Sequence, residues 1–115
     1  MVYYLISGRY TPEALKGMAE NCEDRTEALE KGLSAFGGAM DRMFMALNGL
    51  EFILIAELRD NVAAMAFGSV VVRSGTVLDF KVTPLISMTK MPDVCRIANE
   101  STGHYRPAGV SKIVP

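Results

Sequence analysis

Cysteine and histidine are scarce in this chain, which holds two cysteines and one histidine among 115 residues. Cys22 and Cys95 lie far apart, and neither has another cysteine or histidine at the spacing of a metal-binding motif. We therefore expect no metal site, and no motif indicates a cofactor. The N-terminal stretch lacks the charged start and apolar length of a secretory signal, so we expect a cytoplasmic protein with reduced thiols.

Charge of one sign is not in excess either. The chain has 12 lysines and arginines against 13 aspartates and glutamates, for a formal net charge of −1. Such a balance provides no global field that attracts nucleic acid or an anionic membrane. The longest apolar stretches span about ten residues, whereas a transmembrane helix needs roughly 20. We expect a soluble protein that has neither nucleic acid nor membrane as a partner.

Apolar side chains are abundant, at 50% of the residues, while charged residues make up 22%. The usual charged share is about 25%. A chain of this length forms one modest core, and association with another copy buries further apolar surface. The composition therefore favours one domain that forms a homodimer or a higher oligomer.

An Asn-Gly pair in mid-chain is the clearest structural signal. Asn48 and Gly49 lie between two runs with the length and composition of strands, Met40–Leu47 and Leu50–Leu58. Asn-Gly suits a two-residue turn with positive φ at both positions. The pattern predicts a β-hairpin.

A helical region precedes the hairpin and follows a first expected strand at Val2–Ser7. Thr11 can cap a helix with its hydroxyl, and Pro12 suits the first helical position. Apolar residues then recur every three to four positions until the glycine pair at 37–38. The helical spacing of apolar residues is irregular around residues 21–23, which allows a break into two helices.

A second helix begins at Asp60 and Asn61 and ends near Arg73, and a last strand follows at Thr76–Leu85. One face of this helix is formed by Val62, Met65, Ala66, Ser69 and Val70. In the last strand the alternating sets are Val77, Asp79, Lys81, Thr83 and Leu78, Phe80, Val82. The element order β-α-β-β-α-β predicts an α+β, ferredoxin-like fold, with a four-stranded antiparallel sheet and two helices on one face.

Residues 1–86 are the predicted domain, and residues 87–115 are a C-terminal extension in which apolar density falls. Met91–Ala98 suits a short helix opened by a proline. Asn99–Pro115 is typical of an extended arm.

The stretch from Gly8 to Gly17 reads Gly-Arg-Tyr-Thr-Pro-Glu-Ala-Leu-Lys-Gly. It resembles the opening motif of the GYD domain family of small bacterial and archaeal proteins, and the resemblance covers roughly Val2 to Leu85. Gly49, Leu50 and Glu51 occupy the place of the Gly-Tyr-Asp that names the family. The resemblance implies a fold related to the dimeric α/β barrels, in which two ferredoxin-like sheets pack face to face. That fold alone implies no reaction.

The alternation along the hairpin supports this association independently. Asp41, Met43, Met45 and Leu47 alternate with Met40, Arg42, Phe44 and Ala46, and Glu51, Ile53, Ile55 and Glu57 alternate with Leu50, Phe52, Leu54 and Ala56. No set is cleanly polar, whereas a sheet with helices on one side needs a polar or a covered second face. We expect a second sheet to cover the open face and to enclose a pocket.

The candidate ligand-binding residues are Arg9, Tyr10, Asp41, Met43, Glu51, Asp79, Lys81 and His104. No residue is assigned a catalytic role. Arg9 and Tyr10 suit a small aromatic or anionic ligand, although Tyr10 is more typical of a half-buried packing residue. Asp41 and Glu51 lie near the hairpin, where they bracket a polar ligand or form a solvated turn or an interface ion pair.

Asp79 and Lys81 share one strand face and form either an acid-base pair or a charged surface or subunit contact. His104 completes a pocket only if the C-terminal arm folds over a sheet, and otherwise it lies on an exposed tail. Cys22 falls on an apolar helix face and is expected in the core.

Three classes of function remain open for such a chain. The first is a ligand-binding or regulatory module that needs only a dimer and a cleft. The second is a cofactor-independent enzyme, similar to monooxygenases or isomerases, that acts on an activated aromatic or dicarbonyl substrate. The third is a purely structural, self-assembling module.

Overall fold

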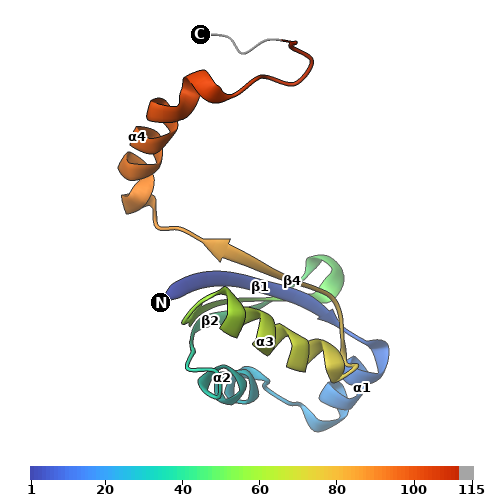
Figure 1. Cartoon of the computed structure of the whole chain (residues 1–115). Coiled ribbons are helices and arrows are strands. Elements are labelled where there is room, and N and C mark those ends of the chain that lie inside the picture. Colours follow the sequence, from blue (N-terminus) through green and yellow to red (C-terminus); the bar gives the residue numbers. More distant parts are fainter. Residues whose placement is uncertain (112–115) are drawn as a thin grey trace. The chain divides into compact units, whose positions relative to one another are not determined.

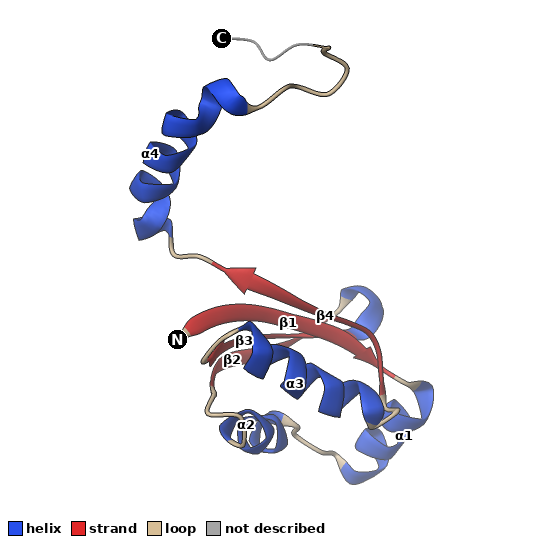
Figure 2. Cartoon of the chain, in the orientation of Figure 1, coloured by secondary structure: helices blue, strands red, loops and turns tan. Residues whose placement is uncertain are grey.

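The computed structural model describes residues 1–111, which fall into two units divided after Leu85. The first unit consists of β1 (Val2–Tyr10), α1 (Pro12–Asn21), α2 (Thr26–Ser34), β2 (Ala39–Ala46), the 3-10 turn η1 (Asn48–Leu50), β3 (Glu51–Leu58), α3 (Asn61–Arg73) and β4 (Val77–Leu85). The second unit contains η2 (Met88–Lys90), α4 (Met91–Ser101) and η3 (Thr102–His104). Figure 2 distinguishes the helices from the strands.

The four strands form one antiparallel sheet in the order β2-β3-β1-β4. Helices α1, α2 and α3 lie on the same side of this sheet (Figure 1). The predicted α+β fold with a four-stranded antiparallel sheet is confirmed, and its element order is that of the split βαβ arrangement. We call the side of the sheet without these helices the open face.

The core lies between the sheet and the three helices. Alternate residues of β3 are buried there, because successive side chains of a strand point to opposite faces. Tyr4 and Ile6 of β1 lie directly opposite Ala56 and Leu54 of β3, and all four are buried. The remaining buried apolar residues are Tyr10, Leu33, Phe52, Leu58, Ala64 and Phe67.

Side-chain caps start two of the helices where the sequence predicts them. The Thr11 hydroxyl oxygen accepts a hydrogen bond from the Ala14 N–H at 3.2 Å, which caps α1. The Asp60 carboxylate accepts one from the Ala63 N–H at 2.9 Å, which caps α3. Each bond satisfies a backbone donor that has no partner within the helix, and such a cap contributes about 1 kcal/mol.

The expected break in the first helical region is also present. Helix α1 ends at Asn21 because Cys22 adopts a left-handed conformation with φ of 47°. Helix α2 begins at Thr26. Cys22 is exposed at this junction, so its predicted place in the core is wrong.

The hairpin forms, but its turn differs from the predicted two-residue type. Ala46 pairs with Glu51, so four residues connect the strands. Gly49 and Leu50 adopt positive φ values of 77° and 51°, whereas Asn48 does not have a positive φ. The extra residues arise because β2 ends one position earlier, and β3 begins one position later, than the apolar runs suggest.

A β-bulge in β2 reverses the predicted faces of that strand. Met40 pairs with Ala56 and Arg42 with Ile55, so Asp41 is an inserted residue. Beyond the bulge, Met43 lies opposite Leu54 on the helix-covered side of the sheet. Met43 therefore packs against the core and does not lie on the open face as expected.

A second bulge lies between β1 and β4. Ser7 pairs with Lys81, but Arg9 pairs with Leu78, and Asp79 adopts a positive φ of 52° at the irregularity. Register shifts of this kind exchange the strand's faces. The prediction that Val77 and Lys81 lie on the same face of this strand is therefore wrong, since Val77 shares the core side with Phe80.

The second unit is more helical than the predicted extended arm. Helix α4 continues past Ala98 to Ser101, and η3 follows. Arg96 supports the helix through ion pairs one turn away in both directions, to Asp93 at 3.9 Å and Glu100 at 3.4 Å. Within residues 1–111, no helix is long and apolar enough to cross a membrane.

Candidate functional site

The open face of the sheet has an apolar centre. Residues directly opposite each other in an antiparallel pair share a face, and this places Leu5 beside Ile55, and Ile53 beside Phe44. Leu5, Ile53 and Ile55 are half-buried although α1, α2 and α3 lie on the other side of the sheet. Phe44 keeps 52% of its surface exposed. An apolar patch of this kind on a sheet face is typical of a surface that contacts another molecule.

Arg9 and Asp79 form an ion pair at one end of the open face. The Arg9 Nε donates a hydrogen bond to Asp79 Oδ2 at 3.1 Å, and a terminal guanidinium nitrogen contacts the same oxygen. Glu51 lies opposite Arg9 across the β1–β3 pair. Asp79 therefore orients the guanidinium and balances its charge, and Glu51 is a second acidic residue at this end of the face.

Lys81 lies next to this group, opposite Ser7 on the β1–β4 pair. Ser7 is largely buried at the middle of the strand. Among residues 1–111, Lys81 takes part in none of the ion pairs. The side chain thus provides a free cation beside a hydroxyl at the edge of the apolar centre.

The other end of the open face is acidic. Tyr3 lies opposite Glu57 on the β1–β3 pair. Hydrogen bonding to Glu57 and the charge of that carboxylate raise the pKa of Tyr3, and the charge of Asp41 adds to the effect. These three residues line a hollow of about 120 Å³ together with Ala39 and Met40. This end suits a hydroxyl or cationic group, not an anion.

Comparison with known protein families gives a match to the GYD domain over residues 4–94. This chain belongs to the GYD domain family. The match continues past Leu85, where the motif resemblance was expected to end, into α4. No curated protein and no solved structure matches the chain.

In this GYD-domain protein, the open face brings together four of the predicted site residues, namely Arg9, Glu51, Asp79 and Lys81. Asp41 lies at the opposite end of the same sheet, in the β2 bulge. Asp79 pairs with Arg9, and an ion pair with Lys81 is not among those of residues 1–111. Asp79 is therefore paired with Arg9 across the strands and not with Lys81.

Besides Asp41, three of the predicted residues do not join this group. Tyr10 is only 7% exposed, and its ring lies 5.0 Å from that of Phe52 on the core side. Burial raises the pKa of Tyr10, and the nearby Arg25 partly offsets that rise. Met43 packs on the same side. His104 belongs to the second unit, at the end of η3.

A hollow that the sequence did not predict lies between α3 and the edge strand β4. Its volume is about 560 Å³, and its lining is mostly apolar. The lining residues are Tyr4, Asn61, Ala64, Met65, Gly68, Ser69, Val72, Phe80, Val82 and Pro84. We call it the α3–β4 groove. One signal was available, because the helix carries no charged side chain between Asn61 and Val72.

Proposed function

We propose that this GYD-domain protein is a homo-oligomeric module that binds a small organic anion between two open faces. The observation that carries the proposal is the apolar centre of Leu5, Ile53, Ile55 and Phe44 on the side of the sheet opposite α1, α2 and α3. A sheet with one covered face normally has a polar second face unless another layer packs on it. Covering the centre with a second copy removes its apolar surface from water.

The arrangement of polar groups supports a symmetric pairing of two sheets. Most charged residues of the open face lie at its ends, where they can stay solvated when the centres pack together. Arg42 is the exception, because it lies opposite Ile55 with its guanidinium carbon 5.9 Å from the centre of the Phe44 ring. Two identical patches related by a two-fold axis form a closed dimer without leaving a patch free. The pocket of this proposal lies between the copies, because a small-molecule site needs walls on more than one side.

Lys81 supports the choice of an anion as ligand. Arg9 is neutralised by Asp79, whereas Lys81 forms no ion pair within residues 1–111 and lies opposite Ser7 on the neighbouring strand. The apolar centre adjoins this cation. A small carboxylate with an aromatic or aliphatic body matches both features.

The oligomer is tested by size-exclusion chromatography with light scattering at micromolar concentration. We expect a mass that is a multiple of 12.5 kDa. The substitution Ile55→Glu places a charge in the apolar centre and should halve the mass. Ala19→Glu is the matched control, because it adds the same charge on an exposed position of α1. A wild-type monomer contradicts the proposal.

Ligand binding is tested by thermal unfolding with a library of small carboxylates. A ligand at 100 times its Kd stabilises the folded protein by about 2.7 kcal/mol. We expect the responding carboxylate to lose most of its effect on Lys81→Met. If no library member raises the Tm while the oligomer persists, the protein is a structural module.

A further inference from the structure

Helix α3 has an outer surface that is not suited to water. No charged side chain occurs between Asn61 and Val72. Val62 and Met65 are 78% and 77% exposed, and Val72 is 50% exposed. The predicted face with Val62 and Met65 is thus the outer one, since the buried residues of the helix are Ala64, Phe67 and Gly68. A helix that is apolar on all sides is normally covered on all sides.

The exposed residues form a stripe, which we define as Val62, Met65, Ser69 and Val72. Their spacings of three, four and three residues place them along one side of the helix. Three of them, together with β4 residues, line the α3–β4 groove. Gly68 brings the helix close to the strand, because a Cβ atom there would lie 2.8 Å from the Phe80 ring. The stripe and the groove form one continuous apolar surface.

The stripe is complementary to itself when one helix is reversed. Its four positions are symmetric about Phe67, so Val62 falls opposite Val72, and Met65 opposite Ser69, in an antiparallel pair. The charged ends match as well: Asp60 caps the N-terminus of α3, and Arg73 lies in its last turn. Reversal places each arginine next to the aspartate of the other copy, and it opposes the two helix dipoles.

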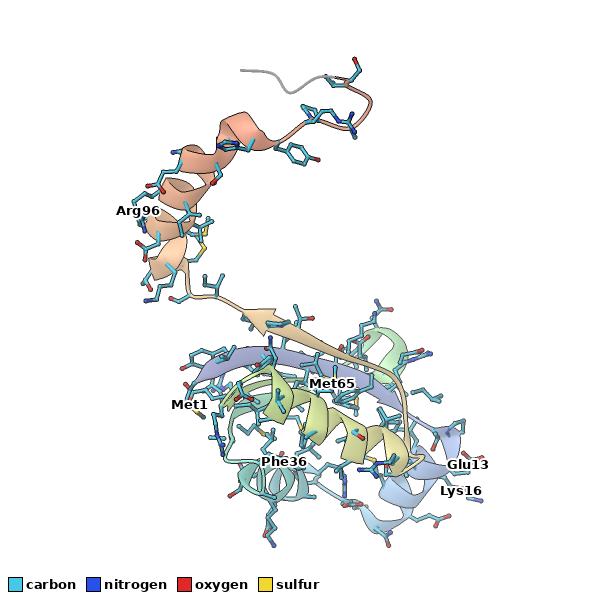
Figure 3. All side chains as sticks on the ribbon, viewed as in Figure 1. Met1, Glu13, Lys16, Phe36, Met65 and Arg96 are labelled. Carbon is cyan, nitrogen blue, oxygen red and sulfur yellow. The ribbon has the colours of Figure 1, made fainter. Side chains whose placement is uncertain are left out.

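We propose that α3 pairs antiparallel with α3 of a second copy of this chain, about a two-fold axis at Phe67, and thereby covers both α3–β4 grooves. The occupant is a second copy because the stripe fits its own reverse in both shape and charge. Helix α3 and the open face lie on opposite sides of the sheet. The helix pair is therefore independent of sheet pairing, and one copy can take part in both interfaces at the same time. Figure 3 labels Met65 near the middle of this helix.

Cross-linking tests the pairing directly. In a Cys22→Ser/Cys95→Ser background, Val62→Cys and Val72→Cys are introduced together, and a thiol cross-linker of short reach is added. We expect a covalent dimer on a denaturing gel, because positions 62 and 72 meet across the axis. Val62→Cys alone is the matched control: in the antiparallel pair its two copies lie about 15 Å apart along the axis, so it should remain monomeric on the gel. All four substituted positions are exposed or half-exposed, which favours normal folding.

The results separate this proposal from the pairing of open faces. We expect the double cysteine variant to cross-link equally well when Ile55→Glu is added. We also expect Met65→Glu to lower the mass in light scattering. Cross-linking by Val62→Cys alone would indicate parallel helices and overturn the proposal. The proposal would also be overturned if the double cysteine variant did not cross-link. An unchanged mass for Met65→Glu, with a circular dichroism spectrum like that of the wild type, would overturn it as well. A rise in Tm with apolar small molecules and no cross-link would assign the groove to a ligand.

Discussion

Arg9 and Asp79 meet across the β1–β4 pair, with the guanidinium Nε 3.1 Å from the carboxylate Oδ2. The aspartate reaches this position because its backbone adopts a left-handed conformation with φ of 52° in the bulge. The ion pair is solvent-exposed, with about half of each side chain accessible, so it contributes little to stability. Its main effect is to fix the direction of the guanidinium at the edge of the open face.

The backbone and the charge of Asp79 can be separated by substitution. Asp79→Asn keeps a side chain that tolerates left-handed backbone, so we expect a loss below about 1 kcal/mol in the free energy of unfolding. Asp79→Val places a β-branched residue at the same φ and should cost roughly 1–2 kcal/mol more. Urea unfolding of both variants measures the difference. Equal stabilities would show that the bulge is not strained.

Gly38 is required for a close approach between the α2–β2 connection and β3. A Cβ atom there would lie 2.6 Å from Leu58 Cδ2 and 2.7 Å from the Glu57 carbonyl oxygen. Because a backbone oxygen cannot move easily, we expect Gly38→Ala to destabilise the protein by about 1–3 kcal/mol. Gly17→Ala is the matched control: nothing lies within 4 Å of its Cβ, and the helix should gain about 0.5–1 kcal/mol. Thermal unfolding that ranks the two variants in the reverse order would refute this packing.

Leu50 has the left-handed φ of 51° that side chains other than glycine and asparagine disfavour. It is also half-exposed, so its replacement loses little burial. We expect Leu50→Asn to stabilise the monomeric fold by about 0.5–1 kcal/mol. Leu47→Asn in the same loop should produce no gain, because Leu47 has an ordinary φ of −65°. Denaturant midpoints of the two variants provide the comparison.

Tyr10 makes the stability depend on alkaline pH. Burial raises the pKa of its hydroxyl above the ordinary value of about 10. The unfolded chain therefore loses this proton at lower pH than the folded chain, and folding stability falls as the pH rises through the folded pKa. We expect the stability difference between wild type and Tyr10→Phe to be constant from pH 7 to about pH 9 and to shift in favour of Tyr10→Phe above pH 10. A difference that does not change with pH would mean that the hydroxyl is solvated.

The sequence alone was sufficient for the element order and for most element starts. Thr11, Pro12 and Asp60 act through atoms within three residues of themselves, so their capping could be read locally. In β3 the strict alternation of buried and partly exposed residues follows from strand geometry, and it was also predictable. The break near Cys22 was also predictable, because the three-to-four-residue spacing of apolar residues is interrupted there.

The tertiary structure decided which side chains share a face. The bulges at Asp41 and Asp79 depend on the register of neighbouring strands, and no local sequence pattern indicates an inserted residue. Each bulge shifts the remainder of its strand by one position, which moved Met43 to the core side and joined Asp79 to Arg9, 70 residues earlier. The exposure of Met65 has the same cause: apolar spacing identifies a stripe, but only packing against β4 determines that Phe67 faces inward and the stripe faces out.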